Sequence, residues 1–101
     1  MAIFGTAFAN AALKSDGSVV VWGDSRFGGN PVDVEGLNSV KNIYSNIYAF
    51  AALKNDDSVA VWGGSVFGGN PSDVEGLNSV KNIYSTEVAF AALKNDGSIV
   101  A

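Results

Sequence analysis

The chain carries an internal repeat with a period of forty residues, and this periodicity restricts its possible folds more than any other feature. The stretch FGGNPVDVEGLNSVKNIYS at residues 27–45 recurs at residues 67–85 with a single difference, Val32 against Ser72. Periods of this length indicate solenoids or propellers, in which similar supersecondary units stack on one another. We therefore expect one repeat domain over residues 1–101, with units at approximately 3–42 and 43–82 and a partial unit at 83–101.

Each unit contains the sequence pattern of a β-hairpin. In AALKSDGSVVVW, residues 11–22, two extended runs flank an Asp-Gly pair, which supplies the positive φ angles of a tight turn. The middle copy has Asp57 where the other copies have Gly17 and Gly97. Because a residue other than glycine is strained in a left-handed conformation, we expect this turn to be the weakest of the three.

The second strand of the hairpin is apolar on both sides. Val19 and Val21 alternate with Val20 and Trp22, so that each pair faces one side of the strand. A strand with two apolar faces is normally covered on both of them. We therefore expect each sheet to lie between two neighbouring sheets.

The rest of the repeat, like the hairpin, has no sequence pattern typical of a helix. Residues 23–38 are expected to be mostly loop, with a short fourth strand around residues 32–34 as an option. NSVKNIYS at residues 38–45 predicts a strand whose alternation places Val40 and Tyr44 on the same face. Apolar residues do not recur at helical spacing over two turns, and glycines interrupt the candidate windows. The predicted fold class is therefore all-β.

Composition excludes several classes of function. Six basic residues against ten acidic ones give a net charge of −4, and the basic residues form no cluster, so a nucleic acid partner is not expected. The chain has neither cysteine nor histidine, which removes disulfides, thiolate zinc sites, thiol nucleophiles and most general bases. We predict that the protein is not an enzyme, with no catalytic residues, no cofactor and no metal site.

The sequence shows no pattern typical of a transmembrane helix or a signal peptide. No apolar run approaches the roughly 18 residues that a transmembrane helix requires. The opening MAIFGTAFANAALK has no basic leading region, and its FANAALK aligns with the later repeats, which indicates a structural segment and not a signal peptide. A cytoplasmic location without membrane contact is the default expectation.

The repeat resembles that of a known family. The series ALKSDGSVVVWGDSRFGGN at residues 12–30, followed by a loop and VKNIYS at residues 40–45, is similar to the repeat of the regulator of chromosome condensation family. The resemblance covers nearly the whole chain and implies β-propeller blades, each with an Asp-Gly hairpin, a strand ending in Trp-Gly and a glycine-rich turn. The forty-residue period is shorter than is usual in that family, which indicates trimmed loops. The nucleotide exchange and chromatin binding known in the family depend on features outside the blade consensus, so they are not carried over.

The ends of the chain both align with the interior of a repeat unit. Residues 2–5 align with residues 42–45, and residues 98–101 align with residues 58–61. About two and a half blades cannot close a ring, and such a fragment would expose an apolar blade face at each end together with unpaired strand edges. We therefore expect identical chains to associate head to tail, as a dimer or a trimer, into a closed ring.

Four aromatic residues are candidates for contact with a ligand or a partner, namely Trp22, Trp62, Tyr44 and Tyr84. Packing between neighbouring blades is the preferred interpretation for the tryptophans, because an aromatic side chain buries about 150–250 Å². The tyrosines could pack between blades or stack against a sugar.

Polar candidates lie in the connecting segments. They are Asn30, Asn70, Asp33 and Asp73. Asp33 and Glu35 are two residues apart and could offer oxygens to Ca²⁺, but the spacing matches no known calcium loop. Solvent-facing loop charges are the preferred interpretation.

These observations favour a non-enzymatic repeat protein that self-assembles and serves as a scaffold for macromolecular interactions, with another protein as a partner besides itself. The alternative is a lectin-like oligomeric propeller with one shallow carbohydrate site per blade, built from the tyrosine, asparagine and aspartate candidates. Saturable binding of a glycan would distinguish the second interpretation from the first.

Overall fold

The computed structural model describes residues 2–64, 68–69, 77–87 and 89–100 of the chain. Within them, nine strands form three antiparallel sheets of three strands each, and the strand order in each sheet follows the sequence. The prediction of an all-β fold is confirmed. The first sheet contains β1 (Ala2–Gly5), β2 (Ala9–Leu13) and β3 (Val19–Gly23); the second contains β4 (Val40–Ser45), β5 (Ala49–Lys54) and β6 (Val59–Gly63); the third contains β7 (Val80–Ser85), β8 (Phe90–Lys94) and β9 (Ile99–Val100).

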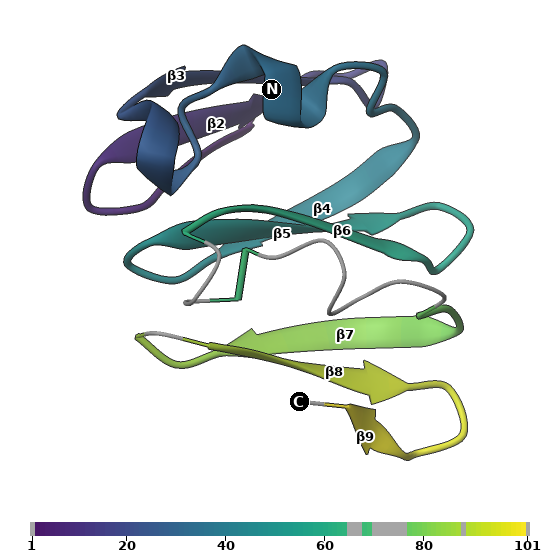
Figure 1. Cartoon of the computed structure of the whole chain (residues 1–101). Coiled ribbons are helices and arrows are strands. Elements are labelled where there is room, and N and C mark those ends of the chain that lie inside the picture. Colours follow the sequence, from purple (N-terminus) through teal and green to yellow (C-terminus); the bar gives the residue numbers. More distant parts are fainter. Residues whose placement is uncertain (1, 65–67, 70–76, 88, 101) are drawn as a thin grey trace.

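The three sheets stack face to face in chain order, from the first sheet at the top of Figure 1 to the third at the bottom. The repeat is reproduced in the strand register, since Asn10 pairs with Trp22 between β2 and β3, and Phe50 pairs with Trp62 between β5 and β6. Equivalent positions therefore occupy equivalent places in successive sheets.

The hairpin turns have the geometry that the Asp-Gly pattern predicts. Gly17 and Gly97 have φ angles of 86° and 88°, and Asp57 takes the same left-handed conformation with a φ of 69°. At the first turn, the carboxylate of Asp16 accepts hydrogen bonds from the backbone N–H and the hydroxyl of Ser18. The same pair of hydrogen bonds recurs at the other two turns.

The connector between the first two sheets differs from the expected loop and optional strand. It contains two short 3₁₀-helices, η1 (Ser25–Phe27) and η2 (Pro31–Val34). Proline at the first position presets a helical φ, and the side-chain oxygen of Asn30 accepts the N–H of Val32 as an N-cap. The strand option at residues 32–34 is therefore wrong, and the equivalent residues 72–74 lie outside the described part of the chain.

The predicted alternation along residues 40–45 is also wrong. A β-bulge between Val40 and Asn42 leaves Lys41 as an extra residue against β5. As a result Val40 and Ile43 are buried in the same cluster, whereas Tyr44 packs against the cluster on the opposite side of the sheet. The equivalent bulge interrupts β7 between Val80 and Asn82.

Buried side chains in the described part of the chain form two clusters. The first lies between the first and second sheets, and the second lies between the second and third sheets. The second sheet is covered on both faces, as expected, and Val61 and Trp62 of β6 are both buried despite pointing to opposite faces. The first and third sheets each have one covered face.

Candidate interaction surfaces

Each sheet has a leading face, directed toward the sheet before it, and a trailing face, directed toward the sheet after it. The leading face of the second sheet packs on the trailing face of the first. It contributes Val40, Ile43, Phe50, Ala52 and Trp62 to this contact. The trailing face of the first sheet contributes Ala9, Ala11, Val19 and Val21, with Phe4 partly buried against them.

The contact between the second and third sheets repeats this arrangement. The trailing face of the second sheet contributes Ala51, Leu53 and Val61, with Tyr44 packed alongside. The leading face of the third sheet contributes Val80, Ile83 and Ala92, with Phe90 packed alongside. Each internal contact therefore joins a trailing face to a leading face.

The remaining two faces are open. On the leading face of the first sheet, Ile3 is 65% exposed, whereas the equivalent Ile43 of the second sheet is 2% exposed. On the trailing face of the third sheet, Tyr84 is 56% exposed and Ile99 is 69% exposed. Large apolar side chains that are covered in the second sheet are thus uncovered at the two ends of the stack.

The two predicted tryptophan candidates have different environments. Trp62 is buried, its ring lies 5.4 Å from that of Phe50 at an interplanar angle of 23°, and its Nε1 donates a hydrogen bond of 3.3 Å to the carbonyl oxygen of Gly28. Trp22 is 45% exposed on the open leading face, where Asn10 replaces the phenylalanine partner. The expectation of core packing therefore holds for Trp62, and Trp22 belongs to the surface.

The two predicted tyrosine candidates lie in one hydrogen-bonded row. Asn42 Nδ2 donates to the hydroxyl of Tyr44 at 3.3 Å, and that hydroxyl donates to Oδ1 of Asn82 at 3.0 Å. Asn82 Nδ2 then donates to the hydroxyl of Tyr84 at 3.3 Å. This tyrosine–asparagine row crosses from the second sheet to the third and ends on the open trailing face.

The polar candidates lie elsewhere. Asn30 caps η2 with its side chain, and η2 packs along β3. Asp33 is exposed on the same helix, and partial desolvation by neighbouring atoms raises the pKa of its carboxyl. The structure thus joins Tyr44 and Tyr84 in the row and places Asn30 and Asp33 on the connector. Asn70 and Asp73 lie outside the described residues.

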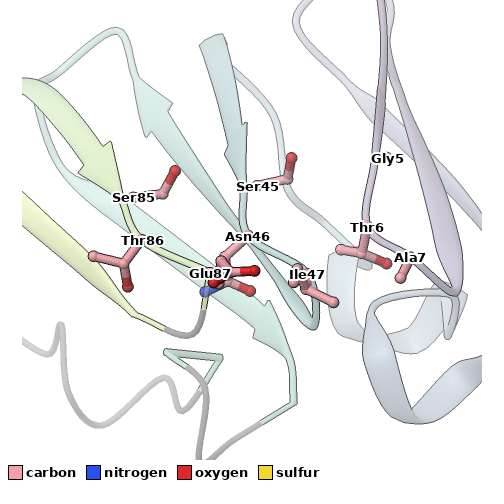
Figure 2. Close-up of a pocket in the computed structure, with 9 residues that line it drawn as sticks. All are labelled: Gly5, Thr6, Ala7, Ser45, Asn46, Ile47, Ser85, Thr86 and Glu87. Carbon is pink, nitrogen blue, oxygen red and sulfur yellow. The ribbon is translucent and has the colours of Figure 1, made fainter.

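A shallow hollow of about 620 Å³ lies where three equivalent loops meet, at residues 5–7, 45–47 and 85–87. The backbone N–H of Ala7 donates to the carbonyl oxygen of Ile47 at 2.9 Å, and the N–H of Ile47 donates to the carbonyl oxygen of Glu87 at 3.1 Å. Figure 2 shows the three loops side by side along the hollow. Each loop is therefore linked to the next by the same backbone hydrogen bond.

A group of aromatic side chains that was not predicted from the sequence lies at the junction of the first two sheets. The ring centroid of Phe8 is 4.9 Å from that of Phe27 and 5.9 Å from that of Tyr48. Phe8 is 47% exposed. Positions 8 and 48 are equivalent in the repeat, so aromatic residues at both could have indicated this group.

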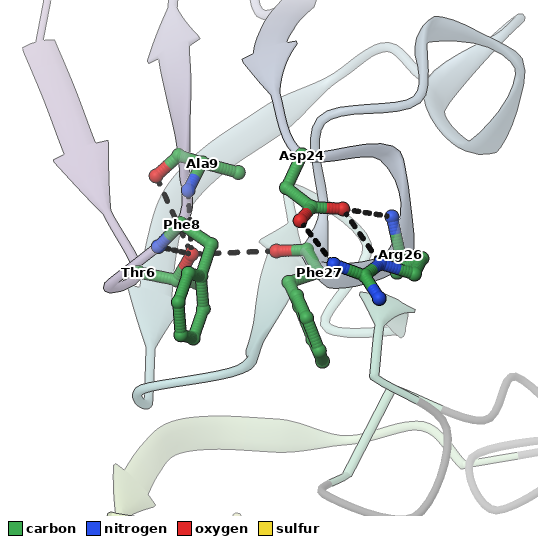
Figure 3. Close-up of polar contacts among 6 residues, drawn as sticks. All are labelled: Thr6, Phe8, Ala9, Asp24, Arg26 and Phe27. Carbon is green, nitrogen blue, oxygen red and sulfur yellow. Dashed lines mark hydrogen bonds and ion pairs between the residues drawn. The ribbon is translucent and has the colours of Figure 1, made fainter.

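Polar contacts hold this aromatic group in place (Figure 3). The hydroxyl of Thr6 accepts the N–H groups of Phe8 and Ala9 and donates to the carbonyl oxygen of Phe27. Arg26 lies 5.2 Å from the centre of the Phe27 ring and pairs with Asp24 at 2.8 Å. The hydrogen bonds from Arg26 lower the pKa of the Asp24 carboxyl to about 2.

The fold and these surfaces define a class of protein, a repeat protein of small stacked antiparallel sheets with an open face at each end. Comparison with protein-family models and with curated proteins gave no match to the chain. None of the helices in the described residues is long and apolar enough to cross a membrane. Across the same residues, the acidic side chains form no group of three or more that could hold a metal ion.

Proposed function

We propose that the chain is a propeller-type repeat protein that assembles with itself head to tail and serves as a non-enzymatic scaffold for macromolecular interactions. In this proposal the sheets are blades of the kind found in the regulator of chromosome condensation family. The leading face of one copy covers the trailing face of another, and two or three copies close a ring. The observation that carries the proposal is the correspondence between the open faces and the faces already packed inside the chain.

The open leading face matches the covered leading faces at two large apolar positions, whereas Asn10 stands where they have Phe50 and Phe90. Ile3 is equivalent to Ile43 and Ile83, and Trp22 is equivalent to Trp62. The open trailing face matches the covered trailing face of the second sheet, since Tyr84 and Leu93 are equivalent to Tyr44 and Leu53. The leading face of a second copy therefore resembles the leading faces that already pack on trailing faces within one chain.

The free energy gained by burying the end faces is close to the free energy that association costs, so we expect assembly to depend on concentration. Full burial of a large apolar side chain contributes about 1.5–3 kcal/mol, and the exposed side chains at the ends are already partly covered by their own sheets. Association costs about 4–15 kcal/mol in translational and rotational freedom. The gain from several such side chains together is similar to this cost, so the oligomeric state has to be measured over a wide range of dilution. A contact between two different faces either closes into a ring or continues as a filament.

Sedimentation equilibrium tests the proposal. We expect the wild-type chain of 10.4 kDa to show two or three times that mass at high concentration, and Trp22→Lys to show the monomer mass. Ser15→Lys adds the same charge at an exposed hairpin tip and should leave the mass unchanged. A folded wild-type monomer at every concentration would overturn the proposal.

Carbohydrate binding is a second candidate function, and the aromatic group at Phe8 favours it. The exposed ring of Phe8 packs on Phe27, and the guanidinium of Arg26 lies over the ring of Phe27, so the group offers an apolar surface next to hydrogen-bond donors. A glycan array followed by calorimetry tests this candidate. Saturable binding that Phe8→Ala abolishes and Ser15→Ala preserves would support it, and the absence of any saturable glycan would reject it.

A further inference from the structure

We infer that two copies join with the same forty-residue step as the internal sheets, so that Tyr84 of one copy faces Ala2 of the second copy. This inference rests on the self-assembly proposed above and adds the register of the contact. It makes Ala2 the residue that distinguishes the join between copies from the joins within a chain.

Backbone hydrogen bonds define the forty-residue step at both ends of β4 and β7, the first strands of the second and third sheets. At one end, Ala7 donates to Ile47 and Ile47 donates to Glu87. At the other end, the N–H of Val40 donates to the carbonyl oxygen of Gly17, and the N–H of Val80 donates to that of Asp57, both at 3.0 Å. The two internal joins therefore have the same register, and one further step carries the N–H of Glu87 to the carbonyl oxygen of Ala7 of the second copy.

The side chains that meet at the tyrosine–asparagine row differ from one join between sheets to the next. Between the second and third sheets, Tyr44 donates to Asn82. Between the first and second sheets, the residue equivalent to the tyrosine is Phe4, which has no hydroxyl to donate to Asn42. In the inferred register, Tyr84 has a hydroxyl but meets Ala2, which has no side-chain acceptor. The join between copies thus supplies the donor and lacks the acceptor.

This arrangement predicts a gain of affinity from one substitution. In Ala2→Asn, the new side chain would occupy the place that Asn82 has against Tyr44. The backbone there is suitable, because Ala2 pairs with Leu13 as Asn42 pairs with Leu53, and Ala2 is exposed. A hydrogen bond of ordinary strength corresponds to a roughly 2- to 12-fold lower Kd. The gain should require the hydroxyl of Tyr84.

A double-mutant cycle tests the register. The Kd of association is measured by sedimentation for wild type, Ala2→Asn, Tyr84→Phe and the double variant, with Ala2→Leu as a control of similar size that has no acceptor. Tyr84→Phe also removes the hydrogen bond from Asn82 in the same sheet, but this loss is common to both backgrounds and cancels in the cycle. Circular dichroism checks that every variant folds.

We expect Ala2→Asn to lower the Kd, and the double variant to show no gain over Tyr84→Phe alone. If wild type associates but Ala2→Asn gives no gain, or the gain persists without the hydroxyl of Tyr84, the register is wrong while self-assembly holds. If wild type and all variants remain folded monomers, the proposed self-assembly fails, and the inferred register fails with it.

Discussion

The indole nitrogen of Trp62 donates a hydrogen bond to the carbonyl oxygen of Gly28, and this contact ties the second sheet to the connector that leads into it. Gly28 has a φ of 110°, and a Cβ added there would lie 2.5 Å from the ring of Phe50. The ring is fully buried, and because buried side chains are closely packed, it could move aside only by displacing its neighbours. The glycine is therefore required for both its backbone conformation and its lack of a side chain.

Gly28→Ala should lower the free energy of unfolding by about 2–4 kcal/mol, which combines overpacking of about 1–3 kcal/mol with about 1 kcal/mol for the left-handed backbone. Gly36→Ala is a matched control, because Gly36 also has a positive φ but a Cβ there would meet nothing within 4 Å. The control should lose about 1 kcal/mol. Urea denaturation measures both, and equal losses would show that the contact with Phe50 is unimportant.

The two tryptophans should differ in their effect on stability. Trp62→Ala should lower the free energy of unfolding by about 3–5 kcal/mol, because the ring is buried against Phe50. Trp22→Ala should cost less than about 1 kcal/mol in dilute solution, where the open leading face is uncovered. Urea denaturation at low protein concentration provides the comparison. Similar losses for both variants would contradict the difference in burial.

The middle hairpin turn has contacts that the sequence does not reveal. The carboxylate of Asp57 accepts a hydrogen bond of 2.8 Å from Nζ of Lys41 and one of 3.4 Å from Nδ2 of Asn95. These contacts join the turn to its own sheet and to the next hairpin, and they offset part of the strain of the left-handed backbone. Lys41 is the extra residue of the β-bulge, so the bulge also brings its side chain to the turn.

Asp57→Ala should therefore destabilise the chain more than Asp57→Gly. Alanine keeps the strained conformation and loses the carboxylate contacts, whereas glycine loses the contacts but relieves the strain. Thermal unfolding of the two variants beside wild type measures the order. A melting temperature of Asp57→Ala equal to or above that of Asp57→Gly would refute the argument.

Much of the fold was predictable because the same hairpin and strand patterns recur in each repeat unit. The hairpin turns follow from Asp-Gly chemistry, and the stacking of sheets follows from strands with two apolar faces. The bulge at Lys41 was not predictable, since alternation assumes an unbroken strand, and only the pairing with β5 shows the extra residue. Pro31 after Asn30 could have indicated the start of η2, because these residues suit an N-cap and a first helical position.

The candidate site residues were less predictable than the fold. Trp22 and Trp62 occupy equivalent positions in the repeat, so the repeat pattern alone does not separate them. Their burial differs because one lies in an end sheet and the other in the middle sheet. The row that joins Tyr44 to Asn82 depends on which residues meet across two sheets, and periodicity within one strand does not show that.

Stability should also depend on pH through the hairpin turns. The hydroxyl of Ser18 lowers the pKa of the Asp16 carboxyl, and the equivalent serines lower the pKa of Asp56 and Asp96. A carboxyl with a lowered pKa in the folded state stabilises the chain above its unfolded pKa of about 3.9, and this contribution is lost as the pH falls through the folded pKa. We therefore expect the free energy of unfolding to decrease as the pH is lowered from about 5 to 2.

Replacing the three turn serines separates this effect from other acid-sensitive groups. In the triple variant Ser18→Ala, Ser58→Ala and Ser98→Ala, each aspartate loses its hydroxyl donor and keeps the backbone N–H of the same residue. The pKa of each aspartate should then rise toward its ordinary value, and the dependence of stability on pH should become shallower. Ser15→Ala removes a hydroxyl from the same hairpin and serves as the control, because the contacts of Asp16 are with Ser18. Urea denaturation at a series of pH values measures the slope, and an unchanged slope in the triple variant would show that the hydroxyls do not set these pKa values.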